Sequence, residues 1–154
     1  MIKQALAMAR RTVRCGILGF GLLVVAGCSG DSDTTLPSPS PDQRWHSQAQ
    51  SDQGKAIYQR YCQDCHNARA RGVRQWKKRD AQGHFPPPPL DGTGHAWHHS
   101  LPTLMQTIRE GGQPNGGQMP PFKDKLNTQQ MLAVMAYFQS YWPDRIYRRW
   151  AQKH

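Results

Sequence analysis

The sequence predicts a small, mostly α-helical domain in which long loops connect at least three helices. Three stretches repeat apolar residues with the period of a helix, and no stretch alternates convincingly as a strand would. Fourteen Gly and twelve Pro among 154 residues indicate a loop-rich fold. Such a domain buries little apolar surface and usually needs a disulfide, a metal or a cofactor for its stability.

The first 27 residues are predicted to be an export signal and not part of the fold. Residues 1–14 contain four basic residues and no acid, and a short apolar run follows from Cys15 to Ala26. A run of this length is too short to span a bilayer as a permanent helix. A basic start followed by a short apolar run is typical of a secretory signal.

The end of that run, Val25-Ala26-Gly27-Cys28, resembles a bacterial lipobox. The resemblance implies cleavage before Cys28 and lipid attachment to its sulfur. Ser29, the next residue, favours the outer membrane in Gram-negative lipoproteins. We therefore expect a periplasmic protein anchored to a membrane through Cys28; the alternative is an ordinary signal peptide that contains a Cys.

Three further segments are expected after the signal. Residues 28–50 are rich in Ser, Pro and Asp and have few large apolar side chains, so they should form a lipidated flexible tether. The folded domain is expected over residues 51–142. Residues 143–154 form a basic tail, which either rests on an anionic membrane surface or frays.

The helices of the domain are placed by their caps and breakers. The first is expected to begin at Ser51, because Ser is a favourable N-cap. The second should lie between Ser100 and Gly111, since Gly often ends a helix. The third begins at Asn127 or the residue after it, and Pro143 stops it.

The chemistry of the chain is concentrated in the motif Cys62-Gln63-Asp64-Cys65-His66. The two Cys lie nearly one helical turn apart, so both thiols can meet the two vinyl groups at one edge of a haem. His66 then lies under the iron. C-x-x-C-H is the attachment signal for haem c, and it occurs once, so we expect one haem. A disulfide or a redox dithiol beside a His is the alternative.

The sixth ligand of the iron must come from another part of the chain, and Met119 is the best candidate. It lies in the loop 116–122, where Gly and Pro allow the backbone to approach a ligand closely. Met105, Met131 and Met135 lie on apolar helical faces, where core packing explains them.

Together these motifs resemble the class I c-type cytochromes from Gly54 to about Trp142. The resemblance implies a cytochrome c fold around one haem, with His66 and Met119 as the axial ligands of its iron. It also implies that Gly54 allows a close crossing with the last helix. The carbonyl of Pro88 is expected to accept a hydrogen bond from His66 and so orient the imidazole.

A histidine-rich segment departs from the family pattern. His84, His95, His98 and His99 flank a run of four prolines and Trp97. In one interpretation Trp97 covers the haem edge or contacts a propionate, and the histidines are solvated beside it. In the other they form a second metal site for copper or zinc, which imidazole suits.

The basic segment Arg69–Arg79 follows the haem motif directly. It is either a solvated insertion or a docking surface for an acidic redox partner, because charge steers short-lived encounters. The chain has a formal net charge of +10. Its core nevertheless has too few basic residues beside aromatic ones to suggest a nucleic-acid groove.

The function predicted from these features is one-electron carriage. Two axial ligands leave no open position for a substrate, and no acid–base or nucleophile set is present, so we do not expect an enzyme. One alternative is a haem protein that binds or senses a ligand when Met119 dissociates. Another is a metal-handling protein whose haem serves the histidine-rich segment.

Overall fold

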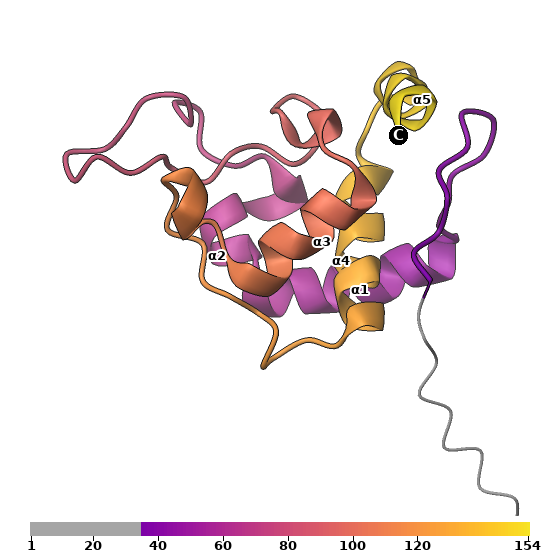
Figure 1. Ribbon diagram of the computed structural model, residues 1–154, viewed down its shortest axis with the longest axis horizontal. Helices are drawn as coiled ribbons and strands as arrows, with labels where there is room; N and C mark the ends of the chain where they lie inside the picture. Colours follow the sequence, from indigo (N-terminus) through magenta and orange to yellow (C-terminus); the bar gives the residue numbers. More distant parts are fainter. Residues whose placement is uncertain (1–34) are drawn as a thin grey trace, which may run out of the picture. The chain divides into compact units, whose positions relative to one another are not determined.

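The computed structural model describes residues 35–154 of the chain. The expected signal peptide, Cys28 and the start of the tether lie outside these residues. The described part contains no strand and no helix that could cross a membrane. Figure 1 shows its helices, which are α1 (Gln48–Tyr61), α2 (Gln63–His66), α3 (Leu101–Glu110), α4 (Thr128–Ser140) and α5 (Asp144–Lys153), with the 3₁₀ helices η1 (Ala68–Ala70), η2 (Ala96–His98) and η3 (Gln113–Asn115).

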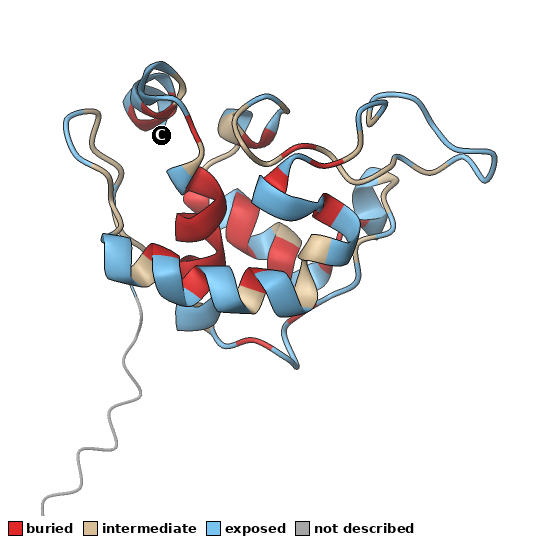
Figure 2. Ribbon diagram, turned by 180° about the vertical axis from the view of Figure 1, so that it is seen from behind, coloured by how far each residue is buried: buried red, intermediate tan, exposed pale blue. Residues whose placement is uncertain are grey.

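The centre of the fold is the crossing of α1 with α4. A Cβ atom on Gly54 would lie 1.8 Å from the carbonyl oxygen of Ala133, so only glycine permits this approach. Next to it, the rings of Tyr58 and Tyr137 lie 4.9 Å apart. Figure 2 shows α4 almost wholly buried, while α1 buries one face. The predicted role of Gly54 in this crossing is confirmed.

The predicted caps of the second and third helices are present. Ser100 Oγ accepts a hydrogen bond from the Thr103 amide (3.4 Å), and Gly111 ends α3. Asn127 caps α4 in a capping box, in which it exchanges two hydrogen bonds of 2.9 Å with Gln130. Such a reciprocal cap satisfies two helix-end donors at once.

The first helix begins earlier than predicted. Its N-cap is Ser47, whose hydroxyl accepts a hydrogen bond from the Gln50 amide (3.2 Å), and Ser51 is buried inside α1. Both serines are good caps in isolation. Ser51 instead donates its amide to the Ser47 carbonyl (3.1 Å), which continues the helix toward the N-terminus.

The end of the segment expected to be a tether is folded against the domain. The Arg44 guanidinium donates to the carbonyls of Gln139 (2.9 Å) and Trp142 (2.7 Å). The indole of Trp45 donates to the side chain of Gln139 (2.6 Å). The tether was predicted from the composition of residues 28–50. Composition cannot reveal that Arg44 and Trp45 bond to buried residues far along the chain.

The segment expected to be a frayed or membrane-bound tail forms helix α5. Its Tyr147 and Trp150 are buried, and the Trp150 indole donates to the His99 carbonyl (2.8 Å). The Arg44 guanidinium also lies 4.2 Å from the centre of the Tyr147 ring. Pro143 lies three residues after the end of α4 and is the N-cap of α5, so it separates the two helices. The described fold therefore extends beyond both expected boundaries, residues 51 and 142.

Candidate functional site

The C-x-x-C-H motif lies at the junction of α1 and α2. Cys62 ends α1 and begins α2, and its carbonyl accepts the amides of Cys65 (3.2 Å) and His66 (2.9 Å) in one tight turn. Both thiols are free: Cys62 is half-buried and Cys65 is exposed. Burial, together with the neighbouring Cys65, raises the pKa of the Cys62 thiol to about 11. The Cys62 thiol is therefore protonated, and the two sulfurs are unpaired and one turn apart.

His66 is buried, with 8 % of its surface exposed. Its Nδ1 donates a hydrogen bond to the Pro88 carbonyl (3.0 Å), which is the partner predicted from the family resemblance. With the proton on Nδ1, the lone pair of Nε2 is available to a metal. Burial lowers the pKa of His66, so its imidazole is neutral.

The Pro88 carbonyl is fixed by a loop that follows the haem motif. Gly72 donates its amide to the His66 carbonyl (2.7 Å) and has a φ of +58°. A Cβ atom there would lie 2.3 Å from the carbonyl carbon of Pro88. Two backbone hydrogen bonds of 2.8 Å join this loop to the proline run, from Val73 to Pro87 and from Leu90 to Ala70.

Two positioning residues at this loop were not predicted from the sequence. Gly72 is one, and Trp142 is the other, because its indole donates to the Leu90 carbonyl (2.7 Å) two residues after Pro88. A glycine soon after the motif was a usable signal, since glycine marks positive φ or close approach. The Trp142 bond joins residues 52 positions apart and left no sequence signal.

Met119 is half-buried in the loop after α3 and packs against the core. The Gly112 amide donates to its carbonyl (2.9 Å), and the Gly117 amide donates to the Gly112 carbonyl (3.1 Å). A Cβ on Gly112 would lie 3.1 Å from the Met119 Cβ. Glycine therefore lets this loop lie directly against the end of α3.

Aromatic rings join the Met119 loop to the end of α1. The rings of Tyr61, next to Cys62, and Phe122, three residues after Met119, have centroids 6.2 Å apart. Phe122 is buried, and its amide bonds back to the Ile108 carbonyl on α3 (3.1 Å). The structure therefore brings Cys62, His66 and Pro88 together directly, and it connects the Met119 loop to the same end of α1.

The four histidines of the histidine-rich segment do not form one site. The rings of His95 and His99 lie 5.4 Å apart, whereas His84 lies beside Asp80 and Gln118. Burial lowers the pKa values of His95 and His99. Over residues 35–154, no three His, Cys, Asp or Glu side chains are placed to hold a metal ion. The described residues therefore do not form the second metal site: His84 contacts Gln118, His95 stacks on Trp76, and His98 lies against Trp97.

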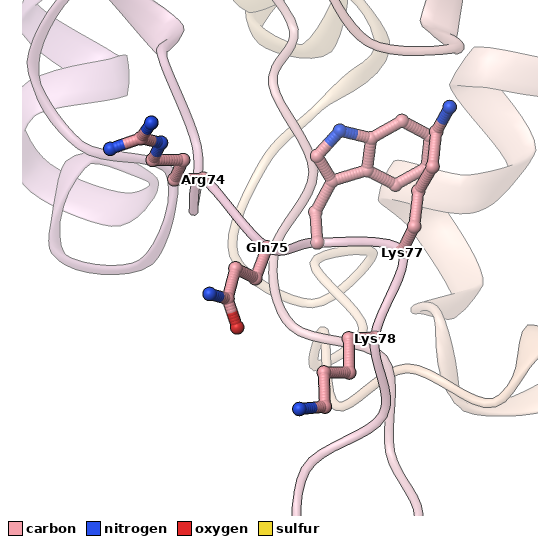
Figure 3. Close-up of a pocket in the computed structure, with 5 residues that line it drawn as sticks. Arg74, Gln75, Lys77 and Lys78 are labelled. Carbon is pink, nitrogen blue, oxygen red and sulfur yellow. The ribbon is translucent and has the colours of Figure 1, made fainter.

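The basic segment forms an exposed surface around Trp76. Residues 74–78 line an open, shallow depression on this surface. Figure 3 shows Arg74, Gln75 and Lys78 leaving the loop on one side. The Lys77 ammonium lies 5.2 Å from the centre of the Trp76 ring, and that ring stacks on His95 at 4.9 Å. The half-buried Trp76 thus anchors a loop whose charged side chains face solvent.

A comparison with protein families gave a match to the model described as "Cytochrome C oxidase, cbb3-type, subunit III" over residues 49–138. The chain is a c-type cytochrome. No curated protein and no solved structure matched it. The helical structure of residues 35–154 agrees with the predicted cytochrome c fold. The cytochrome therefore carries covalently bound haem c, one per chain, and its family indicates haem-based electron transfer.

The residues of this cytochrome fit haem c. Covalent attachment needs two free thiols, and Cys62 and Cys65 are not joined in a disulfide. Axial ligation needs a neutral imidazole with one free nitrogen, and burial and the Pro88 carbonyl make His66 such a group. Met119 packs against the core, where its thioether can serve as the second axial ligand. The loop 116–122 contains no charged side chain that could compete with it for the iron.

Proposed function

We propose that this cytochrome is a one-electron carrier of the bacterial cell envelope, with His66 and Met119 as axial ligands. Cys62 and Cys65 would form the two thioether bonds. The observation that carries the proposal is the buried, neutral His66, whose Nδ1 is hydrogen-bonded to the Pro88 carbonyl, which leaves Nε2 to bind the iron. When bound, the haem supplies a reversible Fe(II)/Fe(III) couple. The chain's own part is to orient the imidazole and to exclude water from it.

The choice of Met119 rests on its loop and on the burial of the competing methionines. Met105, Met131 and Met135 are fully buried in the helical core, where they fill space between α3 and α4. Met119 alone among the methionines of residues 35–154 lies in a loop, and it is only half-buried. A thioether favours Fe(II), so this ligand set raises the reduction potential.

Absorption spectra of oxidised and reduced protein, with and without carbon monoxide, test the ligation. We expect the wild type to show the Met-to-iron charge-transfer absorption and to bind carbon monoxide poorly. Met119→Ala should retain the haem through both thioether bonds, lose the charge-transfer absorption, lower the potential and open the iron to carbon monoxide. Met105→Leu, a volume-conserving change in the core, is the control and should leave the spectrum unchanged.

The same measurement decides between carrier and sensor. Rapid carbon monoxide binding by the wild type would favour the ligand-binding alternative, in which Met119 dissociates. A Met119→Ala variant with wild-type spectrum and potential would show that another residue is the sixth ligand.

We also propose that the mature protein begins at a lipidated Cys28, which holds it at the periplasmic side of a membrane, the outer membrane in preference. The support is the lipobox-like sequence 25–28 at the point where the apolar run ends. Intact mass and membrane fractionation test this proposal. A water-soluble mature protein with an unmodified N-terminus at another residue would contradict it.

The redox partner is proposed to be acidic where it meets the basic segment. Reversing the exposed Arg71, Arg74, Lys77 and Lys78 to Glu should slow association at low salt and leave the haem spectrum unchanged. A control with the same charge change reverses the exposed Lys55, Arg145, Arg148 and Lys153, which belong to α1 and α5 and not to the basic segment. Equal slowing by both sets would show that net charge, and not a docking surface, controls the encounter.

A further inference from the structure

The loop formed by residues 79–85, which we call the brace loop, is closed on itself. The Asp80 amide donates to the His84 carbonyl (2.9 Å), and the Gly83 amide donates to the Asp80 carbonyl (3.1 Å). The Asp80 carboxylate accepts the amides of Gln82 (3.0 Å) and His84 (2.8 Å). These bonds give an exposed loop a defined shape without help from the core.

The brace loop contacts three consecutive residues that lead into Met119. The Phe85 amide donates to the Gly116 carbonyl (2.9 Å), and Phe85 and Gly117 form a parallel β-bridge. The side-chain amide of Gln118 is hydrogen-bonded to His84 Nδ1. Figure 1 shows this loop extending on the left, beside the orange turn that contains η3.

The Phe85 side chain adds a stacked contact at the same place. It is the exposed large hydrophobic residue of the described chain, with 36 % of its surface accessible, and the Arg79 guanidinium lies 3.9 Å from its ring centre. A Cβ on Gly116 would lie 3.2 Å from Arg79 Nη1 and 3.6 Å from the Phe85 ring. The stacked pair therefore lies directly against the turn before Met119.

We propose that the brace loop positions Met119: it fixes the path of residues 116–118 and thereby keeps the thioether at the iron. The inference rests on the proposed axial role of Met119. Backbone hydrogen bonds toward the end of α3 also hold this segment: the Gly112 amide donates to the Met119 carbonyl, the Gly117 amide to the Gly112 carbonyl, and the Gly116 amide to the Gln113 carbonyl. Those bonds fix the segment on the α3 side alone. The brace loop holds the same segment through a second set of contacts. His84 acts through Gln118, and Phe85 acts through Gly116, so both are positioning residues.

The test measures how often Met119 leaves the iron. Carbon monoxide binds when the thioether is off, so its binding rate reports the population of that state. One hydrogen bond has a net effect of about fivefold on such an equilibrium, so His84→Ala and Gln118→Ala should each speed binding about fivefold. Because the two side chains bond to each other, the double variant should be no faster than either single variant.

Phe85→Ala removes the ring under Arg79 and should also speed carbon monoxide binding. The ring is exposed, so this variant is expected to fold. The reduction potential and the charge-transfer absorption should shift in the same variants. Gln82→Ala is the control, because Gln82 has an exposed side chain and is bonded within the brace loop through its backbone amide, which alanine retains, so this variant should behave as wild type.

The results separate this inference from the proposed function. If Met119→Ala opens the iron to carbon monoxide while the His84, Gln118 and Phe85 variants keep wild-type rates and potentials, the brace loop has no positioning role. Loss of stability alone in those variants would lead to the same conclusion. If Met119→Ala has no effect on the spectrum, Met119 is not the ligand and both proposals fall.

Discussion

The His66 side and the Met119 side of the candidate haem site are held in different ways. His66 is buried, and the carbonyl that orients it belongs to a proline whose loop is tied by backbone hydrogen bonds to the segment after the motif. Met119 is half-buried in a loop held by two glycine-mediated backbone bonds and by contacts from an exposed loop. The contacts on the first side are mostly backbone against backbone, and those on the second include flexible side chains.

The difference suits the two roles of the site: one side attaches the haem, and the other side can tune its reduction potential. The side that holds both Cys and the His must keep one geometry, because three of its groups are expected to bind the same haem. The side that supplies the thioether can shift by small amounts, and such shifts change the iron–sulfur bond and hence the potential. Substitutions whose new side chain overlaps the backbone around Pro88 should therefore lower the free energy of unfolding more than substitutions that crowd Met119.

The largest effect is expected for Gly72→Ala on the His66 side. The new Cβ would lie 2.3 Å from the Pro88 carbonyl carbon, and the positive φ adds strain. Together these should lower the free energy of unfolding of the haem-bound protein by about 3–4 kcal/mol. Chemical denaturation measures this loss, and the spectrum should report a disturbed His66.

Gly83→Ala is the matched control for this substitution. It has a similar positive φ of +83°, but nothing lies within 4 Å of the new Cβ. Only the backbone strain remains, so the expected loss is about 1–2 kcal/mol. Equal losses in the two variants would show that the contact with Pro88 does not matter.

The sequence predicted the helical core well because its signals are local. The Ser100 and Asn127 caps follow from residue type and spacing, whereas the role of Gly54, which lets α1 cross α4, followed from family resemblance. The His66–Pro88 contact followed from family resemblance, not from spacing. The predicted domain boundaries at residues 51 and 142 were too narrow. Residues 43–45 and 144–153 fold onto the domain because Arg44 and Trp150 donate hydrogen bonds to carbonyls far away in the sequence.

The histidine-rich segment shows what the sequence could not predict. Four histidines within sixteen residues suggested a metal site, but a loop of this length can place its side chains in several directions. Here His84 is hydrogen-bonded to Gln118, His95 stacks on Trp76, and His98 lies against Trp97 in a tilted arrangement with ring centres 3.8 Å apart. Side-chain direction in an irregular loop has no period that a sequence could reveal.

A smaller effect on the same side is expected for Trp142→Phe. The change keeps a large ring but removes the indole donor to the Leu90 carbonyl (2.7 Å), so stability should fall by about 1–2 kcal/mol. The Val73 and Leu90 amides, which join the loop to the proline run, should exchange faster with solvent. Trp150→Phe removes a similar bond to His99 and should cost as much without affecting those amides.

The smallest effect on stability is expected for Gly112→Ala on the Met119 side. The backbone of Gly112 has an ordinary φ of −99°, and the new Cβ would lie 3.1 Å from the Met119 Cβ. At 3.1 Å the neighbouring residue needs to shift by only a few tenths of an ångström, whereas a contact at 2.3 Å would require a much larger movement of the Pro88 backbone, so the loss of stability should be about 1 kcal/mol or less. The displaced thioether should shift the charge-transfer absorption and lower the potential. Gly117→Ala is the control, since its Cβ would make only an ordinary contact at 3.4 Å with the Gly112 carbonyl, and it should leave both unchanged. A Gly112→Ala variant that loses as much stability as Gly72→Ala would show that the two sides are equally rigid and that the comparison is wrong.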